Sequence, residues 1–535
     1  MNIPINFPFK IHRIRRDLLS KSLMFILFFS LLFSCILTVN AANPLIGTIH
    51  VGSEIELKNA INSATEYTVI VIDRDITLTE TLGIPVDKNI TLTSNNTGFF
   101  KLFGASNQST IMVEAGGMLR LDGIIVTHAS GVSGCGVIVN SDGMFILYDG
   151  AISDNTAMIN GVGGVINDGT FIMYGGEISN NRAAMGSCGG VVNNGVFTMF
   201  GGKISDNYTT RLYGGVVNSG IFTMSGGVIS GNFGYVAGGV FNDGSFSMSG
   251  GVISDNSVVA HSGGGVFNSG SFTMSGGEIF NNTAQSPRRH GGGVFNSGSF
   301  SMSGGVISGN TASKGGGVST TAGSFSMSGG EISNNLASWF GSISGSEPSD
   351  FGIGYGGGVY VEDSVFSMSD GVISGNQAVW CGDVLSGYGG GVYIAGDGVF
   401  ELCGGKISDN TALVTGGGVG VADVAGLAKV FVADGVIFSN NSASVAYNRD
   451  SSHDTIYYSN IGSKVTWTYP FTQGYNNYDI SYTNGSIVNS PEPSISKTNT
   501  APFLFGGLVI IIVGVAVVLV VGVVVVILLS LKKGK

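Results

Sequence analysis

One sequence unit recurs along most of this chain, and it limits the fold more than any other feature. Residues 238–256 read GGVFNDGSFSMSGGVISDN, and residues 264–282 read GGVFNSGSFTMSGGEIFNN. Self-similarity at a fixed period is typical of solenoids and propellers, in which each unit packs against its neighbours. The composition agrees, since 88 glycines and 11% charged residues among 535 are unusual for a globular protein. We therefore expect a repeat architecture.

Eleven units align on three residue types. A phenylalanine opens a segment, an isoleucine follows seven residues later (six in the last unit), and an asparagine follows three residues after the isoleucine. The isoleucines run from Ile152 to Ile437. The phenylalanines are Phe145, Phe171, Phe197, Phe222, Phe246, Phe272, Phe300, Phe325, Phe366, Phe400 and Phe431. The asparagines are Asn155, Asn181, Asn207, Asn232, Asn256, Asn282, Asn310, Asn335, Asn376, Asn410 and Asn440.

Each unit divides into three short pieces, GGVFN, SFSMS and GVIS, which are separated by glycine pairs or Asn/Asp-Gly turns and are too short for helices. In SFSMS the alternation places Phe246 and Met248 on one side and Ser247 and Ser249 on the other, as in a strand with one dry face. If successive units stack in parallel, phenylalanine lies on phenylalanine, methionine on methionine and isoleucine on isoleucine. The pattern predicts an all-β parallel β-helix solenoid.

The recurring asparagines also have a structural explanation. An inward asparagine can hydrogen-bond its amide to the same amide in the next coil, which satisfies buried turn backbone. Charges are scarce because like charges would face each other along a column. We therefore expect an asparagine ladder inside the solenoid.

The two ends of the repeat region differ from its middle. In residues 42–66, Ser53-Glu54-Ile55-Glu56 resembles a capping box, and Leu57, Ala60, Ile61 and Ala64 share one helical face, so we expect an N-terminal capping helix. Residues 67–446 are predicted to form the β-helix, with less regular early coils and eleven regular repeats from about residue 140. The tyrosine-rich residues 447–489 are expected to form a C-terminal cap, and residues 490–502 a linker.

Both chain termini indicate export and anchoring. Residues 1–41 combine five Lys or Arg with an apolar run that closes at Ala41, which predicts a cleaved signal peptide, with an uncleaved anchor as the alternative. Residues 503–531 are almost wholly apolar and long enough for a transmembrane helix, and the lysines of residues 532–535 are expected in the cytoplasm. This predicts a single-pass protein of the cell membrane with an extracellular body.

The charge of the body limits its partners. The chain carries a net charge of −11, the signal +4 and the tail +3, so residues 42–531 carry −11 − 7 = −18. This balance argues against nucleic acid as a partner.

The five cysteines form no metal-binding pattern. Cys35 is expected to leave with the signal peptide. Cys135 and Cys188 each lie five residues before an asparagine, Asn140 and Asn193, so we expect them at the same position of two units that are two apart. That separation is beyond the reach of a disulfide. Cys381 and Cys403 could pair. Without a CxxC or Cys/His cluster, we expect no metal site and no cofactor.

Two short elements carry a resemblance to known proteins. These are GGGV, as in residues 315–318, and I-S-x-N-x-A, as in residues 407–412. They resemble the repeats of pectin-lyase-like, right-handed parallel β-helix surface proteins, including adhesin-like proteins of methanogenic archaea and polymorphic outer-membrane proteins of chlamydiae. The apolar segment and lysines at the end of this chain suit the archaeal comparison better. The resemblance, with the usual sense of parallel crossovers, implies a right-handed coil and an adhesin-like surface function.

An enzyme is the alternative, because many proteins of this fold are polysaccharide lyases or hydrolases that use clustered aspartates and a basic residue. Here the aspartates Asp154, Asp206, Asp255 and Asp409 occur one per coil and read as turn residues. His261 and His290 have no carboxylate or nucleophile at a recognisable spacing. The sequence therefore predicts no catalytic residues.

Binding residues are predicted in the loops between each ladder asparagine and the next glycine run, where most length variation falls. Because the coils are in register, these loops should emerge along one edge, and Tyr, Trp and Arg on such loops are typical of an interaction surface for surface glycans or proteins. The predicted ligand-binding residues are Tyr208, Arg211, Tyr213, Tyr235, Arg288, Arg289, Trp339, Phe340, Trp380 and Tyr388, with His290 and Tyr355 beside them. Sequons that permit glycosylation of an exported chain occur at Asn89, Asn95, Asn107, Asn207, Asn281, Asn440 and Asn484.

Overall fold

The computed structural model describes residues 48–482, apart from residues 66, 95–98, 160, 285–288, 339–353, 380–386, 445, 450–455, 460–465, 468–470 and 472. The predicted signal peptide, linker, transmembrane helix and tail lie outside these residues. The chain divides into two units, residues 1–485 and 486–535, and everything described below belongs to the first. No helix in the described ranges combines the length and hydropathy needed to cross a bilayer.

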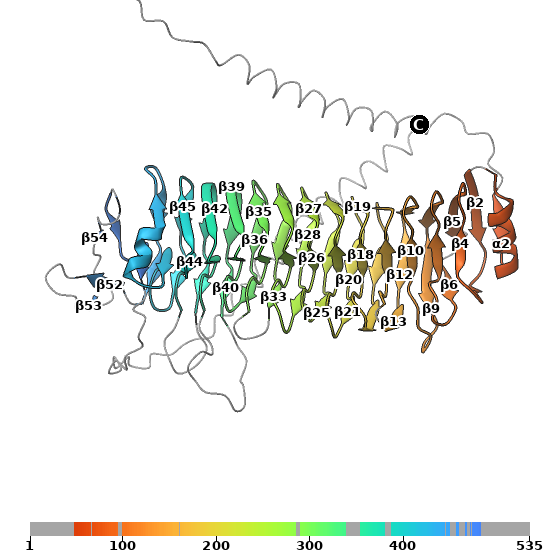
Figure 1. The fold of residues 1–535 in the computed structure, drawn as a ribbon, viewed down its shortest axis with the longest axis horizontal. Coiled ribbons are helices and arrows are strands. Elements are labelled where there is room, and N and C mark those ends of the chain that lie inside the picture. Colours follow the sequence, from red (N-terminus) through yellow and green to blue (C-terminus); the bar gives the residue numbers. More distant parts are fainter. Residues whose placement is uncertain are drawn as a thin grey trace, which may run out of the picture. The chain divides into compact units, whose positions relative to one another are not determined.

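The described chain is a parallel β-solenoid whose regular coils have four strands, so that corresponding strands of successive coils form four ladders (Figure 1). We name three of them by the residue that they point inward. The Phe ladder contains β2 (Tyr67–Ile72), β5 (Asn89–Ser94), β8 (Met118–Asp122), β11 (Met144–Leu147), β15 (Thr170–Met173), β19 (Val196–Met199), β23 (Ile221–Met224), β27 (Ser245–Met248), β31 (Ser271–Met274), β35 (Ser299–Met302), β39 (Ser324–Ser333), β42 (Val365–Ser374), β45 (Val399–Leu402) and β49 (Val430–Val432), and β1 (Ile49–Val51) pairs with β2.

The Ile ladder follows the Phe ladder in each coil, and β39 and β42 run through both. Its other strands are β3 (Ile76–Thr77), β6 (Phe100–Gly104), β9 (Ile124–His128), β12 (Gly150–Ser153), β16 (Glu177–Ser179), β20 (Lys203–Ser205), β24 (Val228–Ser230), β28 (Val252–Ser254), β32 (Glu278–Phe280), β36 (Val306–Ser308), β46 (Lys406–Ser408) and β50 (Ile437–Ser439).

The Val ladder precedes the Phe ladder. It contains β4 (Leu82–Ile84), β7 (Ile111–Val113), β10 (Val137–Val139), β14 (Val165–Asn167), β18 (Val191–Asn193), β22 (Val216–Asn218), β26 (Val240–Asn242), β30 (Val266–Asn268), β34 (Val294–Asn296), β38 (Val318–Thr321), β41 (Val359–Glu362), β44 (Val392–Ala395), β48 (Val419–Val421) and β56 (Ile480–Tyr482).

The fourth ladder, here the short ladder, is not among the three strands predicted for each unit. It contains β13 (Thr156–Ile159), β17 (Arg182–Met185), β21 (Tyr208–Thr209), β25 (Phe233–Gly234), β29 (Ser257–Val258), β33 (Thr283–Ala284), β37 (Thr311–Ala312), β40 (Leu336–Ala337), β43 (Gln377–Ala378), β47 (Thr411–Ala412) and β51 (Ser442–Ala443). Its alanines are buried, so the alanine of the I-S-x-N-x-A element marks a strand of its own.

The predicted columns of like residues are confirmed. Phe171 pairs with Phe197, and Met173 with Met199, in the parallel register of β15 and β19, and the same register recurs in the coils that follow. From Phe145 to Phe400 the rings are at most 1% exposed, with centroids 4.5–5.0 Å apart between neighbours. Each ring therefore removes apolar surface from water and adds a stacking contact to the next coil.

The eleventh unit was aligned one residue out of register. Val430, and not Phe431, pairs with Phe400, and Phe431 is 58% exposed. In the next strand Phe438 pairs with Ile407, and Ile437 is 55% exposed. A shift of one residue along a strand exchanges its inward and outward faces. The six-residue interval between Phe431 and Ile437, in place of seven in the other units, indicated this change of register.

The predicted asparagine ladder runs through the interior and has one direction. From Asn155 onward each Nδ2 donates to the Oδ1 of the next asparagine at 2.9–3.1 Å, as far as Asn441, which takes the place predicted for Asn440. Polar side chains close both ends. His128 Nδ1 lies 2.7 Å from Asn155 Oδ1, and Asn441 Nδ2 donates to Asp479 Oδ1 at 2.9 Å. Asn207 belongs to this ladder and is fully buried, so the folded chain cannot carry a glycan there.

A second asparagine ladder, which sequence analysis did not predict, lies at the end of the Val-ladder strands. It runs from Asn167 to Asn296 with Nδ2-to-Oδ1 distances of 2.7 Å and ends on Thr320 Oγ1. Val139, not Asn140, pairs with Asn167, so Asn167 Oδ1 is buried without a hydrogen bond. The expected equivalence of Cys135 and Cys188 is therefore wrong by one residue. Both thiols are free, as is that of Cys403, and Cys381 lies outside the described residues.

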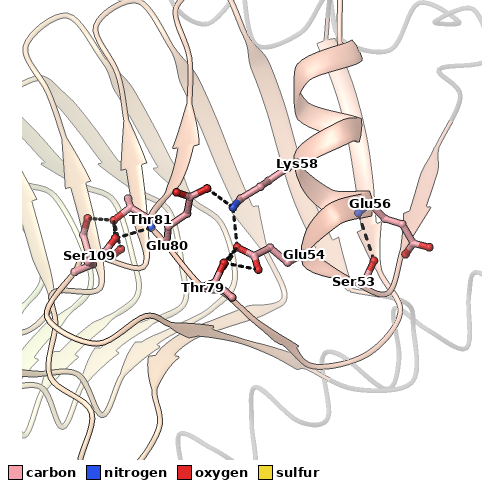
Figure 2. A network of polar contacts seen from close by, with 9 residues as sticks. Ser53, Glu54, Glu56, Lys58, Thr79, Glu80, Thr81 and Ser109 are labelled. Carbon is pink, nitrogen blue, oxygen red and sulfur yellow. Dashed lines mark hydrogen bonds and ion pairs between the residues drawn. The ribbon is translucent and has the colours of Figure 1, made fainter.

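Helix α2 (Glu54–Ser63) covers the first coil with the buried residues Leu57, Ala60 and Ile61. Ser53 Oγ accepts from the Glu56 backbone N–H at 3.3 Å, and Glu56 Oε2 accepts from the Gly52 N–H at 2.8 Å, so the predicted capping box forms with its return bond one residue earlier than usual. Lys58 Nζ lies 2.7 Å from Glu54 Oε1 and 2.6 Å from Glu80 Oε1 (Figure 2). These contacts tie the helix to the loop between β3 and β4.

The far end has a different closure. β56 adds to the Val ladder through pairing with β48, and Phe471, Tyr475 and Tyr482 join the main core. A 3-10 helix, η3 (Val424–Lys429), and two antiparallel hairpins complete this end. The hairpins are β52 (Ala446–Arg449) with β53 (Ile456–Ser459), and β54 (Thr466–Trp467) with β55 (Tyr475–Asn476).

Candidate ligand-binding surface

The turns between the short ladder and the Val ladder form one side of the solenoid, here the loop edge. We define it as the residues between each ladder asparagine and the next glycine run. Only four residues separate Asn310 from Gly315, whereas twenty separate Asn335 from Gly356. Because the ladders hold the coils in register, these turns emerge side by side near β21, β25, β33 and β40 (Figure 1). A rigid scaffold with variable turns on one side is a common arrangement for binding.

Tyr208 and Tyr213 are partly packed into the scaffold. The Tyr208 ring lies 5.0 Å from that of Phe233, and the Arg182 guanidinium lies 5.2 Å from the Tyr208 ring centre. Tyr213 bridges the backbones of Cys188 and Ala237, and its ring lies 4.3 Å from that of Phe241. Burial raises the pKa of Tyr213, so its hydroxyl stays protonated at neutral pH. Both tyrosine rings thus pack against an aromatic ring of the next coil.

Arg211 and Tyr235 are the more accessible of the predicted residues. Arg211 is exposed, and its backbone N–H donates to Thr209 Oγ1 at 3.1 Å. Tyr235 is 45% exposed, and its ring lies 6.5 Å from that of His261 in the next coil. Both are available to a ligand without rearrangement of the coils.

Arg289 and Tyr388 lie further along the same edge. The Arg289 carbonyl accepts from the Lys314 N–H at 3.0 Å and from Ser313 Oγ at 2.8 Å, while its own Nε is buried without a hydrogen-bond partner among the described residues. Tyr388 bridges Tyr355 and Thr415, and the Tyr355 and Tyr388 rings stack at 5.5 Å. Four predicted residues, Arg288, Trp339, Phe340 and Trp380, lie outside the described residues.

The outer face of the Val ladder adds aromatic side chains that sequence analysis missed. Their signal was the fourth letter of GGVFN and its variants, which alternation places outward. Neighbouring rings lie 5.3, 4.7 and 6.0 Å apart for the pairs Phe241–Phe267, Phe267–Phe295 and Tyr360–Tyr393. Tyr355 packs against Tyr360 and Tyr393, and Tyr388 packs against Tyr393. Tyr360 and Tyr393 are only 2% and 5% exposed, so these two rings lie beneath the loop edge and offer a ligand little surface.

His290 has a nucleophile beside it, contrary to expectation. Its Nδ1 lies 3.1 Å from Ser319 Oγ, because Ser319 occupies the adjoining strand of the next coil, 29 residues away. Burial, together with Lys314 and Arg289, lowers the pKa of His290 to about 3. A neutral imidazole with so low a pKa is a weak base, and Ser319 is fully buried. The contact of His290 with Ser319 is therefore part of the packing between coils.

The coil-by-coil aspartates are turn residues, as predicted. Asp154, Asp206, Asp255 and Asp409 have φ between 56° and 60°, a left-handed conformation that Asp and Asn tolerate better than other side chains. Within the part of the chain that the structure describes, no three His, Cys, Asp or Glu side chains gather closely enough to hold a metal ion. The positive φ of these four aspartates is what a turn requires, which agrees with their predicted role.

A second exposed aromatic cluster, also missed, lies at the turn between the Phe and Ile ladders. Tyr148, Tyr174 and Phe200 are 43%, 41% and 50% exposed, and their rings stack at 5.2 and 5.1 Å. The signal was an aromatic residue in place of serine, three residues after the Phe-ladder phenylalanine, in three successive units, before Asp-Gly in the first and before a glycine pair in the next two. Within this stack, both faces of the Tyr174 ring are occupied by its two aromatic neighbours.

Comparison with known proteins adds no assignment, since no family model, curated protein or solved structure matches this chain. The fold class is therefore defined by the strand register alone, as a parallel β-solenoid.

Proposed function

We propose that this chain is a membrane-anchored cell-surface protein, adhesin-like, which binds a glycan or protein ligand through the loop edge. The observation that carries the proposal is the gathering of variable turns and of Tyr and Arg side chains along one side of a rigid scaffold. On the Phe ladder, the outward position between the phenylalanine and the methionine is Ser or Thr in every coil from Thr198 to Ser367.

The location is part of the same proposal. The basic and apolar residues 1–41 favour export, and the apolar residues 503–531 followed by lysines favour anchoring with the solenoid outside the cell. A right-handed coil, as in the surface proteins that the repeats resemble, is also proposed.

The alternative is a polysaccharide lyase or hydrolase of the same architecture. Such an enzyme would need several carboxylates and a basic residue within about 6 Å on an outer groove. The aspartates of the described coils are spread along turns instead, so binding is the better-supported function.

A binding assay on the full-length chain tests the proposal. We expect labelled protein in detergent micelles to bind a subset of glycans or host-cell proteins on an array. Substitution of Tyr235 and Arg211 by alanine should weaken binding, whereas Ser247→Ala and Thr273→Ala on the Phe ladder should leave it unchanged. Degradation of uronate polymers without stable binding would replace this function by the enzyme.

A further inference from the structure

Within residues 140–314, charge is divided sharply between the loop edge and the rest of the coils. Residues 140–314 contain six Lys or Arg and nine Asp or Glu. Arg288 lies outside the described residues. Four of the other five cations, Arg182, Arg211, Arg289 and Lys314, lie on the loop edge, and none of the nine acids does. The four described edge cations give a formal charge of +4, and the rest of these coils carries 1 − 9 = −8. Such a division in a body of charge −18 creates a local field of opposite sign.

The edge cations are also largely free of acidic partners. Among the described residues, no carboxylate lies within 4.0 Å of the charged nitrogens of Arg182, Arg211 or Arg289. The one cation of these coils outside the edge, Lys203, lies 4.0 Å from Asp206. Lys314 is the exception on the edge, with its Nζ 3.9 Å from Glu362 Oε1. A buried, unpaired Arg289 Nε is a costly group to leave without an acceptor.

The described cations lie along a line rather than around a point. Arg182 belongs to β17, and Lys314 follows β37, which is five strands further along the short ladder. At about 4.8 Å per coil this separation is about 24 Å. The tyrosines Tyr208, Tyr213 and Tyr235 lie on the coils between them. An extended chain with separated negative charges matches this spacing, whereas a single phosphate or a metal-bound anion does not.

We propose that the loop edge from Arg182 to Lys314 binds an anionic polysaccharide, through carboxylate or sulfate groups on successive sugars. This inference rests on the proposed binding function and names its ligand class. The tyrosines offer hydroxyl groups and apolar ring edges for sugars between the charges. Duplex DNA, with one charge per about 1.7 Å, would bring more negative charge close to this negatively charged body than the four edge cations neutralise.

Salt-dependent binding of defined polymers tests this proposal. The probes are polygalacturonate, which carries carboxylates, dextran sulfate, which carries sulfates, and neutral dextran, each titrated against the full-length chain in detergent micelles. We expect binding of one or both anionic polymers, with affinity that falls as NaCl rises. Replacement of Arg182, Arg211 and Arg289 by alanine should reduce affinity at least about tenfold and lower the slope of log K against log salt by about two.

Matched variants separate charge from folding. Lys203→Ala removes one cation away from the edge and should leave affinity unchanged. Arg211→Glu changes one exposed side chain and should weaken binding even if the triple variant fails to fold, while the triple Arg→Lys variant should retain most of the salt slope. Three results would overturn the inference. They are equal affinity for neutral dextran and dextran sulfate, higher affinity for duplex DNA or an acidic protein than for the polysaccharides, and an affinity that Arg211→Glu does not change. Tyr235-dependent binding of neutral glycans alone would overturn it while preserving the proposed function, and absence of any ligand would overturn both.

Discussion

The asparagine ladder should be the least replaceable polar feature of the solenoid, and Asn256 in its middle tests this. Its Oδ1 accepts from Asn232 Nδ2 at 2.9 Å and from the Asn232 N–H at 3.0 Å. Its Nδ2 donates to the Ile229 carbonyl at 2.9 Å and to Asn282 Oδ1 at 3.0 Å. All four hydrogen-bonding positions of the amide are filled, and the residue is fully buried.

Asn256→Ala removes all four bonds at once. The Asn232 N–H loses the acceptor that the ladder gives it, at a cost of about 1–3 kcal/mol for a buried unsatisfied donor. Three further bonds of about 0.5–1.5 kcal/mol each are lost from groups that keep other partners, or regain one from water. We therefore expect a loss of about 3–5 kcal/mol in the free energy of unfolding of the coils around β25 and β29.

Asn256→Asp is the more specific test, because aspartate has nearly the same side-chain shape as asparagine but replaces the amide donor with an acceptor oxygen. One carboxylate oxygen would face the Ile229 carbonyl and Asn282 Oδ1, so acceptor meets acceptor. At neutral pH this variant should be less stable than Asn256→Ala, and it should recover in acid as the carboxyl gains a proton. Hydrogen exchange of the β25 and β29 amides measures the local effect, since a long repeat array need not unfold in one step. A loss below about 1 kcal/mol for Asn256→Ala, or an aspartate variant as stable as the alanine variant, would refute the account.

Three further outcomes follow from the described contacts. Val139→Thr should leave the free energy of unfolding nearly unchanged, because the new hydroxyl can donate to the unpaired Asn167 Oδ1 in the next coil. Val137→Thr is the control, since its column offers no unpaired acceptor, and it should cost about 1–3 kcal/mol. Thermal unfolding measures both variants. Between pH 6.5 and 3 the unfolded His290 binds a proton that the folded one refuses, so stability should fall as pH drops through this window, and His290→Gln should remove that fall. Burial would raise the pKa of Glu54, but hydrogen bonds from Lys58 and Thr79 lower it below 4.5. The ionised carboxylate therefore stabilises the fold above pH 4.5, and this stabilisation is lost as the pH falls through the lowered pKa. Glu54→Gln should remove this loss from an acid titration followed by circular dichroism.

Much of the fold could be predicted because stacking makes the sequence period visible. Phe246, Met248 and Ile253 recur at fixed intervals since each must lie over its counterpart, and alternation assigned them to the inner face. The short ladder escaped prediction because two residues such as Ser257–Val258 are too brief to show a period. The eleventh unit failed where the interval changed, which leaves the register ambiguous by one residue and therefore exchanges the faces of Val430 and Phe431.

The candidate site was less predictable for a related reason. The loop edge could be located from length variation, and Tyr235 and Arg211 are exposed there. The contact of His290 with Ser319 could not be read from the sequence, because residues 29 apart become neighbours only when the length of the intervening coil is known. The unpaired Arg289 Nε was likewise invisible, since burial depends on side chains from other coils.

The one-way hydrogen bonding of the asparagines has a consequence for how such a chain can change over generations. In the ladder from Asn155 to Asn441, each amide accepts from the coil before it and donates to the coil after it, while His128 and Asp479 close its two ends. Duplication or deletion of a whole unit between these two residues therefore leaves both terminal contacts intact. The solenoid can be lengthened or shortened in steps of about 4.8 Å without any adjustment of its ends.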